Sequence, residues 1–286
     1  MLIATLIAAG RLDDRLLAAA LARLPGASLA GWVDEGDAVD IVVPNRVEAV
    51  EALQGWESCD VVVQSPKYRQ KTLLVADMDS TIIGQECIDE LADYAGFKPQ
   101  VAAITERAMR GELDFEAALR ERVALLKGLS VAAIARCLAE RIRPNSGAST
   151  LVRTMTAHRA HTILVSGGFT DFVAPIAAIV GFDDYRANML SRRNDVLTGR
   201  VEGEIVDSRV KRRILQEERA RLSLDPALVM ALGDGANDLP MIEEAGMGVA
   251  YRAKPILADA ADARLEHHGL DALLWAQGIP RAAWVS

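Results

Sequence analysis

Three short apolar runs, each followed directly by a cluster of polar residues, constrain the fold of this chain most strongly. They span residues 73–76, 163–165 and 229–232, and the clusters after them read Asp-Met-Asp-Ser-Thr, Ser-Gly-Gly and Gly-Asp-Gly-Ala-Asn-Asp. Runs of this length, separated by helical patterns, are typical of buried parallel strands. Because ligands bind beyond the carboxyl ends of the strands in an open parallel sheet, we expect the three clusters to meet at one edge of such a sheet.

This edge would bring together four carboxylates, those of Asp77, Asp79, Asp234 and Asp238. Carboxylates held so close repel one another unless a cation lies among them. Oxygen ligands favour a hard cation, so Mg²⁺ is the metal that the sequence predicts. Asp77 and Asp79 lie two residues apart at the end of an apolar strand, and such a pair suits one carboxylate that attacks phosphorus and another that acts as general acid and base.

The composition limits the classes of function. The chain has 286 residues, of which 51% are hydrophobic and 25% charged, and this is enough apolar material for a large core. A formal net charge of -8 disfavours nucleic acid as a partner, because binding to a phosphate backbone requires a basic face. No apolar run reaches the roughly 18 residues of a membrane span. The three scattered cysteines indicate a reduced, cytoplasmic protein, and the expected partner is a small molecule.

Residues 1–68 are expected to form a small α/β unit, which carries none of the polar clusters. Its strands and helices should follow one another in the order strand, helix, strand, strand, helix, strand, at residues 2–8, 13–24, 28–33, 39–43, 47–53 and 60–64. The polar residues 65–71 are expected to form a linker to the rest of the chain. The unit could serve packing or dimerisation, or it could sense a ligand, and the sequence leaves both open.

Residues 85–144 differ from the rest because they contain helical patterns and almost no strand-like run. The expected helices are residues 87–95, 99–110, 114–127 and 130–142. Asp114 and Ser130 are the expected N-caps of the last two. Strand and helix patterns alternate in the flanking residues 69–84 and 145–286, with a hairpin expected at 196–201. The sequence thus predicts an α/β protein with a Rossmann-like core and a parallel sheet, a helical cap inserted after the first core strand, and the small N-terminal α/β domain.

The helix expected at residues 114–127 carries Arg122 in the middle of its apolar face. On a helical wheel, the neighbours of Arg122 on this face are Phe115, Ala118, Leu119, Leu125 and Leu126. A cation in such a place needs a buried anion, either from an ion pair within the cap or from a substrate carboxylate. Glu86, at the entry to the cap, could accept from a substrate ammonium. Together with a phosphate site, these two side chains would suit an O-phospho amino acid as the substrate.

The polar clusters also have a known counterpart. Residues 77–81, residues 166–168, Lys211 and residues 233–238 resemble, in their order and spacing, the haloacid dehalogenase-like (HAD) phosphohydrolase superfamily, over about residues 72–275. Within it, the chain is similar to the phosphoserine phosphatases. The resemblance implies hydrolysis of O-phospho-L-serine to serine and phosphate through an aspartyl-phosphate, which is the last step of serine biosynthesis. It also implies that the N-terminal unit is ACT-like.

The resemblance implies roles for individual residues. Asp77 would be the nucleophile, Asp79 the acid and base, and Lys211 a catalytic cation beside the nucleophile. Mg²⁺ would be held by the carboxylates of Asp77 and Asp234 and by the backbone carbonyl of Asp79. Two further residues, Asn237 and Asp238, would order the surroundings of the metal. The residues that bind the substrate would be Glu86, Met109, Phe115, Arg122, Ser166, Gly167, Lys211 and Asn237.

Three alternatives stay open on the sequence. The chain could be a phosphatase for another small phosphate such as phosphothreonine, a phosphotransferase to homoserine, or a non-catalytic amino-acid-sensing regulator with a HAD-like shell. Intact Asp77, Asp79, Lys211 and Asp234 count against a pure sensor. The sequence also leaves open whether the chain forms a homodimer.

Overall fold

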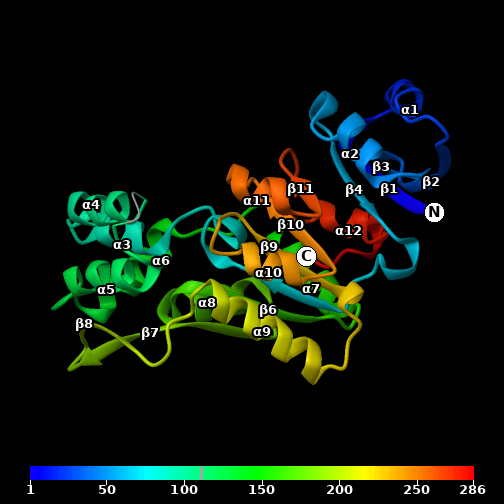
Figure 1. The fold of residues 1–286 in the computed structure, drawn as a ribbon. Coiled ribbons are helices and arrows are strands. Elements are labelled where there is room, and N and C mark those ends of the chain that lie inside the picture. Colours follow the sequence, from blue (N-terminus) through cyan, green and yellow to red (C-terminus); the bar gives the residue numbers. More distant parts are fainter. Residues whose placement is uncertain (110–111) are drawn as a thin grey trace.

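The computed structural model of the chain describes residues 1–109 and 112–286. Figure 1 shows three parts in a row: a small N-terminal unit at one end, a core built on a sheet in the middle, and a helical cap at the other end. No helix in the described residues is long and apolar enough to cross a membrane. The predicted α/β class is confirmed, with a parallel core sheet, a helical cap and an N-terminal α/β unit.

The N-terminal unit has the predicted order of strands and helices. Its sheet is antiparallel throughout, with the strand order β2-β3-β1-β4. Both helices begin at polar caps, because Asp13 accepts the N–H of Leu16 and Asn45 accepts the N–H of Val47. The elements are β1 (Leu2–Leu12), α1 (Asp14–Ala22), β2 (Ser28–Asp34), β3 (Gly36–Val43), α2 (Arg46–Leu53) and β4 (Asp60–Gln64).

The core sheet has the strand order β11-β10-β9-β5-β6-β7-β8, and neighbouring strands are parallel except for β7 and β8. Its strands are β5 (Leu73–Ala76), β6 (His161–Phe169), β7 (Asp184–Arg193), β8 (Val196–Glu202), β9 (Val229–Gly233), β10 (Met247–Tyr251) and β11 (Ala263–Leu265). Its helices are α7 (Ala148–Ala157), α8 (Thr170–Val180), α9 (Ser208–Arg221), α10 (Leu239–Glu244), α11 (Pro255–Ala260) and α12 (Ala272–Ala276).

The three apolar runs of the sequence are β5, β6 and β9, and they lie side by side in the centre of the sheet. Successive residues of β5 point to opposite faces. Leu74 therefore belongs to the apolar cluster formed with α7, α8 and α12, whereas Leu73 belongs to the cluster formed with α9 and α10. Because both faces are covered by helices, the open side of these strands is their carboxyl edge.

The hairpin lies at a different place from the one predicted. Residues 196–201 were expected to contain the turn, but they form one continuous strand, β8. The turn is at Asn194 and Asp195, which both have left-handed backbone angles, with φ of 51° and 61°. Asn and Asp tolerate this conformation, and such a turn matches the twist of the two strands. Gly199 lies within the strand with a left-handed φ of 78°, and a Cβ there would also lie 2.9 Å from the Cβ of Lys127.

The cap consists of α3 (Cys87–Tyr94), α4 (Lys98–Met109), α5 (Phe115–Leu125) and α6 (Val131–Arg141). The two predicted N-caps are confirmed, because Asp114 accepts the N–H of Ala117 and Ser130 accepts the N–H of Ala132. The hairpin of β7 and β8 extends from the core beneath α5 and supports the cap (Figure 1). The cap is thus held over the carboxyl edge of the core sheet.

The N-terminal sheet is covered on both faces. Helices α1 and α2 pack on one face, whereas Ile7, Ala38 and Val62 on the other face share an apolar cluster with Trp275 of α12. The segment that was expected to be a linker is packed as well, since Nη1 of Arg69 lies 2.6 Å from Oδ2 of Asp40. Removal of the N-terminal unit would therefore uncover apolar surface on the core.

Asp60, at the start of β4, joins the N-terminal unit to the core through a fully buried carboxylate. It accepts the backbone N–H groups of residues 266–268 and, at 2.7 Å, the Nδ1–H of His268. Burial alone would raise the pKa of Asp60, but these hydrogen bonds outweigh it and hold the pKa below its usual value. We expect Asp60→Asn to lower the free energy of unfolding by about 2–4 kcal/mol, because an amide NH₂ would face N–H donors.

Urea unfolding of Asp60→Asn and of the unchanged protein at several pH values measures this effect. Asp14→Asn, on the exposed side of α1, is the control and should change stability little. Because folding lowers the pKa of Asp60, its contribution is present above the pKa of an unfolded Asp, about 3.9, and is lost as the pH falls through the folded pKa. A loss of stability of the same size at about pH 3 and about pH 7 would contradict this account.

Candidate active site

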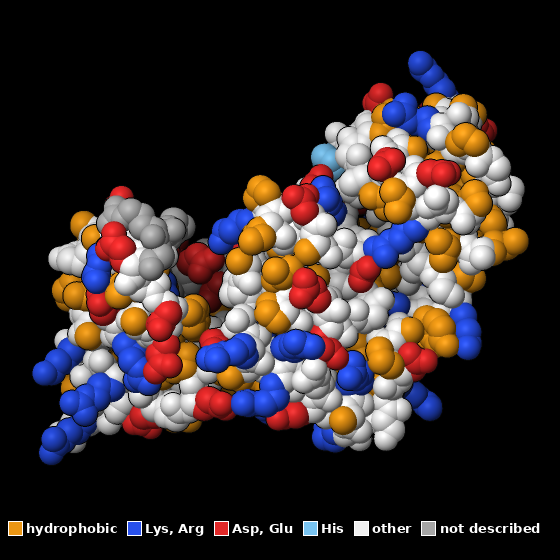
Figure 2. All heavy atoms as spheres, viewed as in Figure 1, with side chains coloured by type: hydrophobic (Ala, Val, Ile, Leu, Met, Phe, Trp, Pro, Cys, Tyr) orange, Lys and Arg blue, Asp and Glu red, His pale blue; other side chains and the backbone are white. Residues whose placement is uncertain are grey.

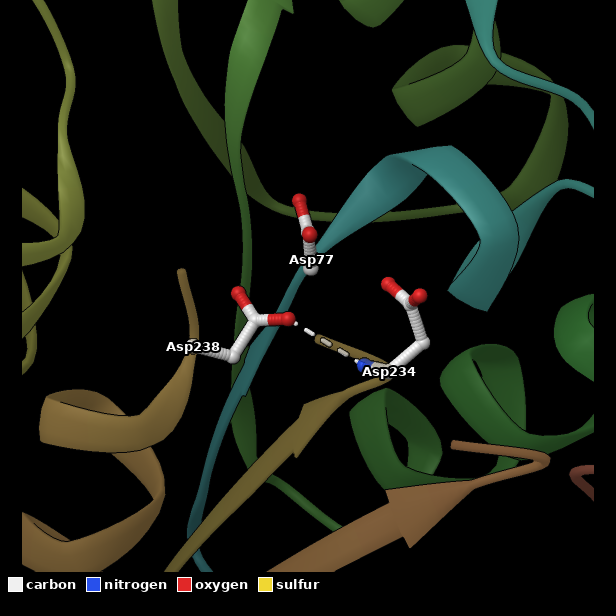
Figure 3. A group of neighbouring side chains, drawn as sticks. All are labelled: Asp77, Asp234 and Asp238. Carbon is white, nitrogen blue, oxygen red and sulfur yellow. Dashed lines mark hydrogen bonds between the residues drawn. The ribbon is translucent and has the colours of Figure 1, made fainter. Parts of the chain in front are cut away.

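Three of the four predicted carboxylates converge at the carboxyl edge of the sheet. Asp77 follows β5, Asp234 follows β9, and Asp238 precedes α10. Figure 3 shows the three side chains as neighbours, and one carboxylate oxygen of each lies within 4.8 Å of one oxygen of each of the other two. All three are buried, with 3%, 7% and 0% of their surface exposed. The structure therefore forms the acidic cluster that the sequence predicted.

One buried lysine lies among these carboxylates. Nζ of Lys211, near the start of α9, is 2.7 Å from Oδ1 of Asp77 and 2.7 Å from Oδ1 of Asp238. Burial alone would lower the pKa of Lys211, but the charges of Asp238 and Asp77 outweigh it and raise the pKa above its usual range. Burial and the charge of Asp238 raise the pKa of Asp77 well above its usual value. They raise the pKa of Asp234 to about 6. One ammonium thus faces three carboxylates, and a divalent cation with oxygen ligands fits the remaining charge.

The carboxylate of Asp238 is already bound by hydrogen-bond donors of the protein itself. Besides contacting Lys211, it accepts the backbone N–H groups of Asp234 and Gly235 through Oδ2, at 3.1 and 3.3 Å. The carboxylate of Asp234, in contrast, accepts no hydrogen bond from the residues that the structure describes. Asn237 donates from Nδ2 to Oδ2 of Asp77 at 3.2 Å. Asp77 and Asp234 are therefore better candidates for binding a cation, and Asn237 and Asp238 are placed to orient them.

Asp79 lies where the core meets the cap. Its Oδ1 accepts the N–H of Cys87, the first residue of α3, at 3.1 Å. Burial, followed by the charge of Glu86, raises the pKa of Asp79 to about 7. Ser80 has a left-handed backbone with φ of 55° and donates to Oε1 of Glu86 at 2.8 Å. A carboxyl group with a pKa near neutrality can both give and take a proton, which suits the role predicted for Asp79.

Residues 166–168 bring backbone close to the carboxylates. Oγ of the fully buried Ser166 accepts the N–H of Gly168 at 2.8 Å. A Cβ at Gly168 would lie 3.0 Å from Oδ2 of Asp79, and a Cβ at Gly167 would lie 3.0 Å from Cζ of Phe115. A side chain at either position would therefore require these neighbours to shift. The segment runs directly into α8, whose N-terminus favours an anion.

Asn188 was not predicted from the sequence, although it holds this segment in place. It is fully buried on β7, donates to the carbonyl of Gly167 at 2.8 Å, and accepts the N–H of Val206 at 2.8 Å. The available signal was weak: an Asn within a strand pattern is unusual, but nothing near it in sequence shows what it contacts.

A cavity of about 220 Å³ lies between the cap and the core. Figure 2 shows it as a hollow between the two parts, with acidic side chains at its bottom. Residues from the core and the cap line it together: Asp77, Asp79, Glu86, Ile88, Phe115, Leu119, Arg122, Ser166, Gly167, Gly168, Phe169, Asp234, Asn237 and Lys254. Lys254 was not among the predicted site residues. The side chain of Met109, which was among them, lies outside the part of the structure that is described.

Arg122 extends into this cavity from α5. Its Nε donates to the carbonyl of Ala118 at 3.3 Å. Within residues 1–109 and 112–286, no carboxylate lies at ion-pair distance from its guanidinium. Burial lowers the pKa of Arg122, against the charges of Asp89, Glu86 and Asp79. Of the two roles considered for Arg122, an internal ion pair is therefore not observed there, and the binding of an external carboxylate fits the geometry.

In the absence of metal, the carboxylate cluster should make the protein less stable as the pH rises. Folding raises the pKa of Asp234 from 3.8 to about 6, so its protonated form is favoured in the folded state. The resulting stability is present below about pH 4 and is lost as the pH rises through about 6, at a cost of about 2–3 kcal/mol. A bound divalent cation would replace the proton, so Mg²⁺ should stabilise the protein more at about pH 8 than at about pH 5.

Thermal unfolding with EDTA or with saturating Mg²⁺, across this pH range, measures the difference. The Mg²⁺-dependent gain should disappear in Asp234→Asn, which has no carboxylate to offer. An equal gain in both proteins would mean that Mg²⁺ binds elsewhere.

Comparison with known proteins agrees with this geometry. The family model for haloacid dehalogenase-like hydrolases matches residues 74–243. A phosphoserine phosphatase from Polaromonas sp. is 48% identical over 207 residues, covering 71% of this chain and 88% of that protein. The crystal structure of a HAD family hydrolase from Salmonella enterica serovar Typhi has a TM-score of 0.87 at 28% identity, covering 96% of this chain and 98% of the other. A phosphoserine phosphatase structure, a phospho-aspartyl intermediate analogue, has a TM-score of 0.66 at 38% identity, covering 72% and 98%. The chain belongs to the haloacid dehalogenase-like hydrolase family.

Proposed function

We propose that the protein is a Mg²⁺-dependent phosphatase that hydrolyses O-phospho-L-serine to serine and phosphate, the last step of serine biosynthesis, in the cytoplasm. One observation carries this proposal: a single cavity joins the acidic cluster around Asp77 to Arg122 and Glu86. The first group suits a phosphate and a metal, and the other two suit the carboxylate and the ammonium of an amino acid. The phosphoserine phosphatases among the relatives support the same substrate.

The reaction begins when a carboxylate oxygen of Asp77 attacks phosphorus and the bond to the serine oxygen breaks. Asp79 gives its proton to that oxygen, and serine leaves. Water then attacks the aspartyl-phosphate, Asp79 takes a proton from it, and phosphate and the Asp77 carboxylate are restored. The relative solved as a phospho-aspartyl intermediate analogue supports this order.

The other residues of the site neutralise charge and hold the phosphoryl group, which is most of what phosphoryl transfer requires. Lys211 supplies an ammonium beside Asp77. Ser166 and Gly167 line the same cavity, where the Ser166 hydroxyl and the Gly167 N–H would donate to phosphate oxygens, and Asn237 donates to Asp77. Mg²⁺, held by Asp77, Asp234 and the carbonyl of Asp79, would supply further positive charge.

We propose that the chain divides into an N-terminal domain of residues 1–68, a catalytic core of residues 69–84 and 145–286, and a cap of residues 85–144. The cavity lies between the core and the cap, so the cap must open to admit the substrate and close to exclude bulk water. Phe115, which contacts the segment around Gly167, would be part of this closure. The N-terminal domain would also be the part that forms a homodimer, which measurement of the protein's size in solution tests.

A panel of phosphate esters, assayed with and without Mg²⁺, tests the proposed activity. Phosphoserine should be hydrolysed faster than phosphothreonine, and only when Mg²⁺ is present. Addition of homoserine should not divert the phosphate into a new ester. Phosphothreonine as the better substrate would change the assignment, and the absence of any phosphate release would favour a regulator.

Asp79→Asn should slow the first step more for phosphoserine than for an aryl phosphate. General acid catalysis contributes about 10²–10⁴-fold, and a phenolate leaves with little need of a proton. The amide oxygen of the introduced side chain could still accept the Cys87 N–H that Asp79 accepts at 3.1 Å, so the local fold should remain. Rapid-mixing measurement of the released alcohol separates this step from the hydrolysis of the intermediate. Equal losses for the two substrates would argue against the acid role.

A further inference from the structure

Lys254 is a second lysine at the edge of the active-site cavity, and the mechanism proposed above does not use it. It precedes α11, and its side chain lines the cavity together with Asp77, Asp234 and Asn237. Its backbone N–H donates to the carbonyl of Asp234 at 2.8 Å, which ties its position to the loop after β9. Its ammonium lies 3.8 Å from Oδ2 of Asp234, and its side chain is 65% exposed.

The two lysines of the site differ in what their ammonium groups can still bind. Lys211 is 1% exposed and lies 2.7 Å from both Asp77 and Asp238, so it is committed to these two carboxylates. Nζ of Lys254 makes no hydrogen bond to any residue for which the structure gives a position, because 3.8 Å is beyond hydrogen-bond distance. Its three donors are available to an anion that enters the cavity.

The ammonium of Lys254 also lies where it would repel a metal ion bound to Asp234. Asp234 is a candidate ligand of the divalent cation, and the ammonium of Lys254 lies 3.8 Å from its Oδ2. A cation bound to Asp234 would lie near this ammonium, and the two like charges would repel each other. The lysine side chain is exposed and can move away, whereas its backbone stays in place through the hydrogen bond to Asp234.

We propose that Lys254 exchanges partners as the site fills. It neutralises Asp234 before the metal binds, and after the metal has bound, its ammonium turns to the oxygen atoms of the phosphate group in the cavity. Lys254 is therefore both a competitor of the metal and a binding residue for phosphate. The inference rests on the proposed function only in taking a phosphate group as the ligand.

Lys254→Met tests this because it removes the charge and keeps a long, flexible side chain. Isothermal titration should show that Mg²⁺ binds about 2- to 5-fold more tightly in the absence of phosphate, since a repelling charge has gone. Inorganic phosphate, titrated at saturating Mg²⁺, should bind about 2- to 5-fold more weakly. Changes in affinity of this size are expected when one exposed charge is removed. Both effects should shrink at high salt, and Lys254→Arg should behave like the unchanged protein.

Lys98→Met is the matched control. Lys98, on α4, is 66% exposed and lies 3.6 Å from Asp93, so it has a similar environment outside the cavity. It should change neither affinity. If Lys254→Met leaves either affinity unchanged, or weakens both together, the exchange of partners is wrong. Both titrations use Mg²⁺ and inorganic phosphate alone, so their results stand whether or not phosphoserine is the substrate, and a failure to hydrolyse phosphoserine would overturn only the proposed function.

Discussion

Asp77→Asn should reduce phosphate release from every substrate by about four orders of magnitude or more, because a neutral amide cannot attack phosphorus. The fold should persist. Oδ1 of Asp77 accepts the N–H of Met78 at 2.7 Å, and an amide oxygen can accept the same bond. The substitution also removes a negative charge from a cluster in which burial and the charge of Asp238 raise the pKa of Asp77. The metal-free variant should therefore unfold at the same temperature as the unchanged protein or at a higher one.

Activity and thermal unfolding, measured on the same preparation, separate loss of chemistry from loss of fold. Asp195→Asn is the matched control, because Asp195 is exposed in the turn between β7 and β8, where Asn tolerates a φ of 61°. Rapid denaturation during turnover should leave labelled phosphate on the unchanged protein and none on Asp77→Asn. Substantial turnover by folded Asp77→Asn would exclude a covalent mechanism through this side chain.

Arg122→Ala should raise the KM for phosphoserine strongly. A charge-assisted contact to a buried carboxylate, once lost, costs about 2–5 kcal/mol, which corresponds to about 30- to 5,000-fold. An aryl phosphate has no carboxylate for Arg122 to bind, so its hydrolysis should change by less than about 3-fold. Arg122→Lys should be intermediate, because lysine keeps the charge and lacks the two-pronged geometry.

Arg120→Ala is the control on the same helix. Arg120 is exposed on another face of α5 and pairs with Glu116 at 2.8 Å, so its loss should leave both substrates nearly unaffected. Steady-state kinetics of the three variants with both substrates provide the comparison. If Arg122→Ala slows both substrates alike, Arg122 supports the cap, and the assignment of an amino-acid substrate weakens.

The carboxylate cluster could be predicted from the sequence because the position of each of its residues follows from the neighbouring residues in the chain. Asp77 and Asp234 each follow an apolar strand directly, and neighbouring parallel strands place their carboxyl ends at one edge. Arg122 could be identified for a similar reason, since a helical wheel shows that it interrupts an apolar face. In both cases, the periodicity of one element determines where the side chain points.

Asn188 and Lys254 could not be found in this way. Asn188 acts on Gly167 across a pair of strands, and Lys254 reaches the cavity because its loop bonds to Asp234. Each depends on a contact between segments far apart in the chain. The sequence misplaced the turn of the hairpin because Thr198 and Gly199 are residues typical of turns. In the structure, Gly199 has a left-handed φ of 78° within β8 and lies close to Ala124 of α5.

The sequence by itself determined the α/β class, the cap insertion and the residue types of the site, because these follow from hydrophobic periodicity and from motifs at strand ends. Only the tertiary structure decided how the N-terminal unit is attached. The residues expected to form a linker are packed, and Asp60 and Arg69 bind partners in another unit of the chain. The structure also decided that Arg122 and Glu86 share a cavity with Asp77. Burial and the charge of Glu86 then give Asp79 its pKa of about 7. The physical reason is that desolvation and charge coupling depend on distances between segments, and no local pattern encodes these distances.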